Sequence, residues 1–113
     1  ASAVLGFFKQ YFETVIAGDT ETYNTYFTEN YYKTNKPYVQ FAPQMIYNIE
    51  VEERAYKSNP DGTATHGFYV TYMIYKNDGT FRNDIDSDAA KTLYYELIEY
   101  EDGRVKIDKI TNK

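Results

Sequence analysis

The chain has 113 residues, of which 42% are apolar and 26% charged, a balance that suits one globular domain with a single core. Its formal net charge of -5 and the lack of a Lys/Arg cluster disfavour nucleic acids and anionic membranes as partners. The absence of cysteine excludes disulfides, a thiol nucleophile and cysteine-based zinc sites. With 14 Tyr, 7 Phe and only three Leu, tyrosine must fill much of the core, and each buried hydroxyl needs a partner. Such a core tends to open onto a pocket or an interface.

The N-terminal segment is predicted to form two helices with almost no linker. Gly18 is suited to the left-handed backbone that ends a first helix, and Asp19 or Thr20 then caps a short second helix that ends near residues 29–30. Tyr23, Tyr26 and Phe27 lie on one side of it. Apolar residues at helical spacing form one wide stripe on the first helix: Val4, Leu5, Phe8, Phe12, Val15 and Ile16.

Residues 31–43 are predicted to be loop, because prolines interrupt them at positions 37 and 43. The period then changes to two, which predicts a half-buried strand with Met45, Tyr47, Ile49 and Val51 on one side. The turn signal Asn-Pro-Asp-Gly at 59–62 separates this strand from a second one. That second strand places on one face His66, Phe68, Val70, Tyr72 and Ile74.

A second turn is predicted at 77–79, followed by a polar excursion over residues 80–88. A third strand over 89–101 places Leu93, Tyr95 and Leu97 on one face, and the turn at 102–103 leads into a last strand. Helices followed by a meander of long strands predict an α+β fold, with two N-terminal helices packed on a strongly curved antiparallel sheet. Residues 1–113 are expected to form a single domain.

Two blocks carry a resemblance to a known superfamily. They are the opening "VLGFFKQYFETVIAGDTETYNTYFT" and the strands "MIYNIEVEERAYKSNPDGTATHGFYVTYMIYKNDGTF" with "KTLYYELIEYEDGRVKID". This pattern resembles the cone-shaped nuclear transport factor 2-like fold, a cystatin-like architecture. Within it, the layout of the central strands is similar to the transpeptidase-associated domain near the N-terminus of some penicillin-binding proteins. The fold hosts isomerases, dehydratases, transport factors and inert accessory domains, so the resemblance alone does not determine a function.

The cellular location is predicted from composition. Cysteine-free domains rich in Tyr, Asn and Lys are common outside the membrane of Gram-positive bacteria, which favours an extracytoplasmic protein. No stretch approaches the length of a transmembrane helix, so we expect no direct membrane insertion. The opening Ala-Ser is typical of a trimmed start, which would leave a leader or anchor outside this chain.

The only histidine, His66, is the one candidate general base. It shares a strand face with aromatic residues, and together they predict an apolar pocket inside the cone: His66, Phe68, Tyr72, Tyr95 and Phe12. The alternative is a structural or surface histidine, since it lies near a turn where side chains are often exposed, and no acidic residue clearly shares its face on that strand. We favour this second interpretation and assign no catalytic residue.

The acidic run Asp84, Asp86 and Asp88 has carboxylates at alternate positions, as calcium loops do. The glycine expected after the third carboxylate is Ala89, and the bidentate glutamate expected at the twelfth position is Tyr95. We therefore interpret the run as a solvated loop, and we predict neither a metal site nor a cofactor.

The second face of the sheet is the most informative feature of the sequence. It carries a predicted interface set: Tyr69, Met73, Tyr75, Tyr94, Ile98 and Tyr100. Tyr and Met are enriched in interfaces, which favours a surface that binds a partner. The alternative is that the aromatic residues form cross-strand pairs whose role is to stiffen the sheet. The resemblance adds that relatives often form dimers through this face.

Two functions remain open. The first is a non-catalytic extracytoplasmic accessory domain, associated with transpeptidase proteins, that forms a homodimer or docks to another protein domain. The second is a small-molecule-binding protein or an isomerase-like or dehydratase-like enzyme that uses the pocket.

Overall fold

A computed structural model describes residues 2–35, 39–41, 43–74 and 90–112. The predicted turn at 77–79, the acidic run at 84–88 and Tyr75 lie outside these residues. The described elements are α1 (Ser2–Ala17), α2 (Thr20–Tyr23), α3 (Glu29–Thr34), β1 (Ile46–Ser58), β2 (Ala64–Ile74), β3 (Ala90–Glu99) and β4 (Val105–Asn112).

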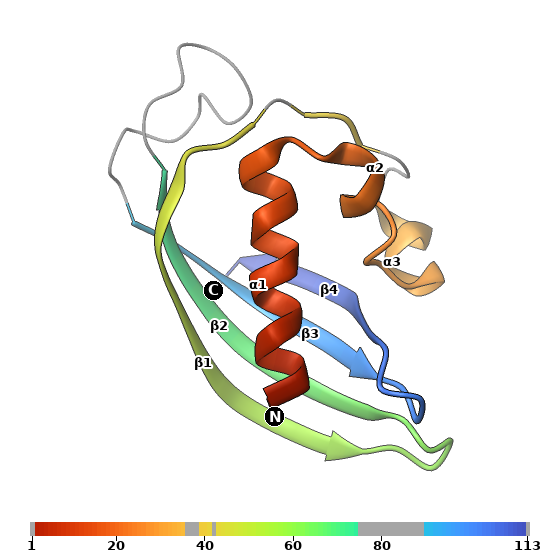
Figure 1. Cartoon of the computed structure of the whole chain (residues 1–113). Helices are drawn as coiled ribbons and strands as arrows, with labels where there is room; N and C mark the ends of the chain where they lie inside the picture. The colour runs from red at the N-terminus through yellow and green to blue at the C-terminus, as the bar shows by residue number, and fades with distance from the viewer. Residues whose placement is uncertain (1, 36–38, 42, 75–89, 113) are drawn as a thin grey trace.

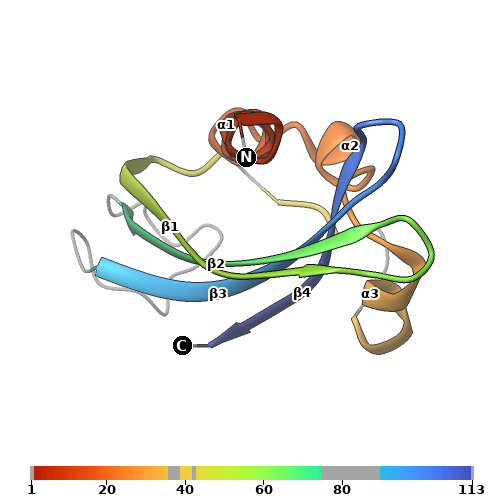
Figure 2. The same cartoon turned by 90° about the horizontal axis from the view of Figure 1, so that it is seen from below.

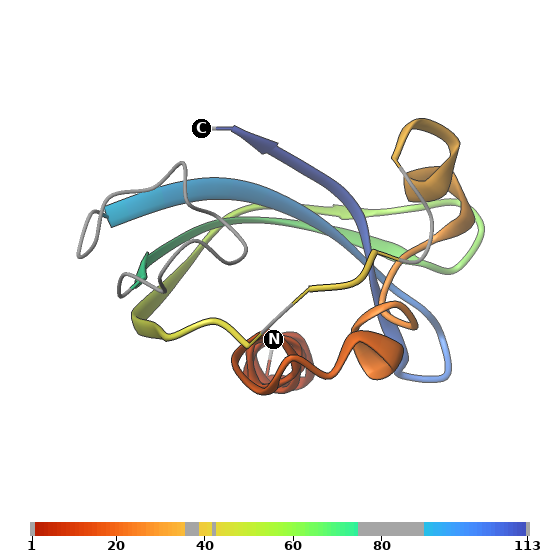
Figure 3. The ribbon, with the colours of Figure 1, turned by 90° about the horizontal axis from the view of Figure 1, so that it is seen from above.

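The strands form one antiparallel sheet in the order β1-β2-β3-β4, and the helices precede it in the chain (Figure 1). Figures 2 and 3 show that the sheet curves and that α1 lies across its concave side. We call this side the concave face and the opposite side the outer face. The predicted α+β class, with short N-terminal helices packed on an antiparallel sheet, is confirmed.

Edge-to-face and tilted aromatic contacts join α1 to the concave face. The ring of Phe8 lies 5.1 Å from that of Phe68 and 5.5 Å from that of Tyr95, measured between centroids. Farther along the helix, Phe12 lies 5.7 Å from Tyr72. Each pair of this kind adds about 0.5–1.5 kcal/mol beyond the area that it buries. These contacts set the distance between helix and sheet, and therefore the depth of the interior.

The end of α1 follows the predicted chemistry. Gly18 has φ +70°, and the side chain of Asp19 accepts a hydrogen bond from the Thr22 amide at 3.2 Å, which caps α2. Pro43 packs against Gly18 so closely that a Cβ there would lie 2.8 Å from the proline ring.

The prediction of two helices was wrong in its boundaries, because the described part of the chain forms three. Residues 26–28 run beside β4: the Ile107 amide donates to the Tyr26 carbonyl at 2.7 Å, and the Thr28 amide donates to the Ile107 carbonyl at 3.0 Å. Thr28 then caps α3 by accepting from the Tyr31 amide at 3.1 Å. Part of the predicted loop over 31–43 is therefore helical.

The predicted apolar stripe of α1 is also narrower than expected. Leu5 is 50% exposed and Ile16 is 41% exposed. Both line a shallow groove between α1 and β1, because β1 is an edge strand with no further strand beyond it among the described residues.

The alternation predicted for β1 breaks at a bulge. The register shifts between Tyr47 and Glu50, where Asn48 has φ +53°. Tyr47 consequently pairs with Met73 of the outer face, whereas Val51 pairs with Val70 of the concave face. The four residues predicted to share one side therefore do not.

Candidate functional site

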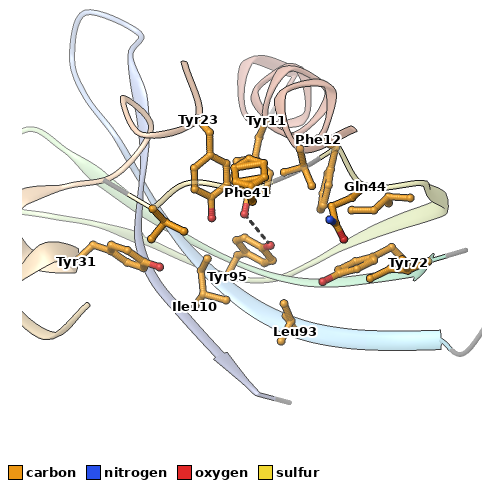
Figure 4. Close-up of a pocket in the computed structure, with 14 residues that line it drawn as sticks. Tyr11, Phe12, Tyr23, Tyr31, Phe41, Gln44, Tyr72, Leu93, Tyr95 and Ile110 are labelled. Carbon is orange, nitrogen blue, oxygen red and sulfur yellow. Dashed lines mark hydrogen bonds between the residues drawn. The ribbon is translucent and has the colours of Figure 1, made fainter. Parts of the chain in front are cut away.

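A cavity of about 240 Å³ lies between α1, α2, α3 and the concave face (Figure 4). Its lining combines aliphatic side chains with phenols and one carboxamide. The lining residues are Tyr11, Phe12, Val15, Tyr23, Tyr31, Val39, Phe41, Gln44, Ile46, Tyr72, Ile74, Leu93, Tyr95 and Ile110. Among these described residues there is no carboxylate, imidazole, amine or guanidinium.

Two buried phenols meet in the interior. The hydroxyls of Tyr11, from α1, and Tyr95, from β3, are 3.3 Å apart, and either can be the donor (Figure 4). Burial raises the pKa of both groups, and the hydroxyls of Tyr95 and Tyr23 raise that of Tyr11 further. Both phenols therefore stay neutral far above physiological pH.

The remaining polar groups of the lining are neutral as well. Burial raises the pKa of Tyr31 to about 12. Gln44 is buried, and its backbone N–H donates to the Val15 carbonyl at 3.2 Å, which ties the segment before β1 to the helix. The cavity thus offers neutral donors and acceptors on an apolar wall, and Tyr11, Tyr31 and Tyr95 do not titrate near pH 7, where a general base works best.

The structure brings together three of the five predicted pocket residues. Phe12, Tyr72 and Tyr95 line the cavity. Phe68 is buried against Phe8 but does not line it, and neither does His66.

His66 lies toward the other end of β2, between two carboxylates. Its Nδ1 is 2.9 Å from Oε2 of Glu53, and its Nε2 is 2.9 Å from Oε1 of Glu99. Of the predicted alternatives, structural or surface, the surface one was wrong, because His66 is only 4% exposed. The two glutamates come from the neighbouring strands β1 and β3, so the lack of an acidic residue on the same face of β2 did not leave His66 without a partner. Both ring nitrogens of His66 are therefore engaged by glutamate side chains.

The outer face carries an aromatic pair. The rings of Tyr69 and Tyr94, on paired positions of β2 and β3, are 5.2 Å apart and edge-to-face. The Arg54 guanidinium lies over the Tyr69 ring at 5.2 Å. These three residues line a shallow hollow together with Thr111 and Asn112.

The other predicted interface residues surround this pair to different degrees. Met73 and Ile98 are half-buried and lie on the same face. Tyr100 follows β3, and Arg104 lies over its ring at 4.9 Å. Tyr94 also covers the Cα of Gly67, so the cross-strand pair contributes to the stability of the sheet whether or not a partner binds.

No group of three or more His, Asp or Glu side chains within the described ranges is arranged to hold a metal ion. None of the described helices combines the length and the apolar character needed to cross a membrane.

Comparison of the chain with family models, with curated proteins and with solved structures finds no match. The resemblance to the nuclear transport factor 2-like superfamily therefore stays a prediction.

Sequence reasoning missed much of the cavity lining. Tyr23 was predicted on a helix face, without a role for its hydroxyl, and Tyr11 was not assigned to the pocket. Val39 and Phe41 fall in the segment 31–43 that was predicted to be loop, and Gln44 follows it. The sequence signal for these residues is that other apolar residues lie near them in the chain, and this does not indicate which part of the fold they contact.

Proposed function

We propose that this chain is a non-catalytic accessory domain of the cone-shaped nuclear transport factor 2-like type that acts by contact with other molecules. We further propose that it belongs to an extracytoplasmic protein of the transpeptidase-associated kind. This second part rests on the sequence resemblance and on composition.

The outer face supports contact with a protein. Tyr69, Tyr94, Met73 and Ile98 are all partly exposed there, while α1 occupies the concave face. The ion pair between Arg54 and Glu52, at 3.5 Å, adds charged groups beside this aromatic centre. Aromatic residues, Met and Arg in a polar surround are the composition that distinguishes interface centres from other surface. This is the observation that carries the proposal.

The position of His66 supports a domain without catalysis. Both ring nitrogens are engaged by glutamates, and the ring lies outside the cavity. A general base needs a nitrogen within hydrogen-bond reach of a substrate, and here both reach carboxylates instead.

Self-association through the outer face is tested by light scattering across a range of concentrations. Replacing Ile98 by Lys places a charge at this face without removing the Tyr69–Tyr94 pair. We expect the wild-type chain to form a dimer and the Ile98→Lys chain to remain a monomer. Leu5→Lys is the matched control, because Leu5 is exposed on the opposite side of the molecule and its replacement should leave the dimer intact.

If the wild-type chain stays monomeric at millimolar concentration, the proposal of a homodimer is wrong. Docking to a neighbouring domain is then tested by comparing the two variants in the full-length protein. Loss of a domain contact in Leu5→Lys, with Ile98→Lys unaffected, would assign the contact to the groove beside α1 instead.

A small-molecule-binding role is the second candidate, and the cavity of about 240 Å³ favours it. Nothing comparable supports the enzymatic form of this candidate, because the described lining offers no carboxylate or imidazole to act as a general base. Binding without chemistry is compatible with the first proposal.

A further inference from the structure

We propose that the cavity is a binding site for a small neutral molecule with one or two rings and a carbonyl oxygen, which the Tyr11 and Tyr95 hydroxyls recognise. This inference deepens the proposed binding role of the domain and rests on it. It concerns the interior, and it is independent of what the outer face contacts.

The size of the cavity limits the ligand. An apolar cavity of about 150 Å³ is large enough to bind benzene, whereas drug-sized ligands occupy roughly 300–1,000 Å³. At about 240 Å³ this cavity lies between the two. A ring with a short substituent, or a small bicyclic molecule, fits that volume.

The lining excludes charged ligands. A carboxylate or phosphate would lose its hydration with no cationic partner among the described lining residues, and the net charge of -5 would repel it. An ammonium ion would have aromatic rings nearby but no carboxylate in the lining. A neutral ligand costs much less to desolvate, and its rings can pack against Phe12, Phe41 and Leu93.

The phenol pair provides the specific contact. At 3.3 Å the O–H···O distance between Tyr11 and Tyr95 exceeds the usual range of about 2.5–3.0 Å, so this bond is weak. When both hydroxyls donate to one ligand oxygen, the new bonds replace this weak one and the contact between the Tyr11 and Tyr23 hydroxyls. Because both remain neutral, they keep their hydrogens, and a carbonyl is the neutral group that accepts two such donors at one atom.

Three probes of nearly the same shape, acetophenone, α-methylstyrene and benzoate, test this inference together with the bulkier cation phenyltrimethylammonium. They differ in having a carbonyl, a hydrocarbon, an anion or a cation beside the ring. Binding to the native chain is measured by thermal shift and by NMR titration, since a ligand that binds the folded state raises Tm. We expect acetophenone to bind about tenfold more tightly than α-methylstyrene, and the two ions not to bind.

Variants then locate the contact. Tyr95→Phe keeps the ring and removes one hydroxyl, so its affinity for acetophenone should fall towards its affinity for α-methylstyrene. If the Tyr95→Phe chain does not fold, Tyr11→Phe replaces it in the same measurement. Leu93→Trp fills the cavity and should abolish binding of both. Tyr69→Phe, on the outer face, is the matched control and should bind as the wild type does.

Equal affinity for acetophenone and α-methylstyrene would overturn the role of the phenols. If benzoate or phenyltrimethylammonium binds, or if none of the four probes binds, the proposal of a site for neutral ligands is overturned. Neither result affects the proposal for the outer face. Chemical conversion of a bound probe, seen in the same NMR spectra, would instead overturn the non-catalytic function.

Discussion

Replacing His66 by Phe tests whether the histidine is structural. The variant keeps a ring of similar size, so it retains packing against Phe68, whose ring is 6.2 Å away, and against Tyr56, at 5.0 Å. It removes both hydrogen bonds to the glutamates. The change therefore isolates the polar contribution of the imidazole from its packing.

The magnitude follows from the exposure of the partners. A hydrogen bond to a charged group contributes about 1.5–3 kcal/mol when it is fully buried. The side chains of Glu53 and Glu99 are 39% and 30% exposed, so water screens both contacts and rehydrates the carboxylates in the variant. We therefore expect each hydrogen bond to contribute about 1 kcal/mol, so His66→Phe should lower the free energy of unfolding by about 2 kcal/mol.

Urea denaturation followed by circular dichroism measures this loss. With a typical slope, a change of about 2 kcal/mol moves the midpoint by roughly 1 M. A double-mutant cycle assigns the effect: Glu99→Gln should cost about 1 kcal/mol in the wild-type chain and close to zero in the His66→Phe chain. Glu52→Gln is the control, because Glu52 is well exposed and its replacement should change stability by less than about 0.5 kcal/mol.

A His66→Phe chain as stable as the wild type, within about 0.5 kcal/mol, would refute this reasoning. The two glutamates would then be bystanders, and a role for His66 in binding or catalysis would regain support.

Three further predictions follow from other parts of the fold. Gly18→Ala should destabilise the chain by about 1–3 kcal/mol in urea denaturation, because φ +70° is strained for alanine and the new Cβ would clash with Pro43. Gly6→Ala should instead stabilise the chain by about 0.5–1 kcal/mol, because Gly6 lies inside α1 with open space around it. In a spectrophotometric titration at 295 nm, Tyr11 and Tyr95 should stay protonated above pH 10, the usual pKa of a phenol in an unfolded chain. Because folding raises the pKa of each, the stability that they confer is complete below pH 10 and falls above it by about 1.4 kcal/mol per pH unit for each phenol. Ionisation of Tyr11 and Tyr95 near pH 10 in the folded chain would contradict the buried pair. Thr28→Ala should cost about 1–2 kcal/mol in thermal unfolding, since it removes the cap of α3 and the 2.8 Å bond to Asp108, and Thr25→Ala, on an exposed turn, should cost less.

Period-two patterning predicted β2 and β3 well, because both strands have one face on the core. Phe68, Val70, Tyr72 and Ile74 are all buried on the concave face, as their alternation indicates. Edge strand β1 was predicted less well. A bulge is a local backbone choice that shifts every later side chain to the other face, and nothing in the alternation from 45 to 51 indicates where it occurs.

The helix boundaries failed for a different reason. Nothing local to residues 26–28 predicts an extended segment, and they are held in it by hydrogen bonds to Ile107, about eighty positions away. The environment of His66 has the same origin, since Glu53 and Glu99 reach it only through the register of three strands. Pairings of this kind depend on tertiary contacts, which local propensity does not encode.

The cavity itself can be traced to the choice of tyrosine over leucine. Leucine side chains on α1 and on the sheet would interdigitate and close the interior to the density of an ordinary core. A phenol cannot bury its hydroxyl against carbon without losing a hydrogen bond, so the Tyr11 and Tyr95 hydroxyls lie 3.3 Å apart while their rings pack edge-to-face at 5.8 Å. Both side chains line the cavity, so the tyrosine-rich composition accounts for the polar groups inside it.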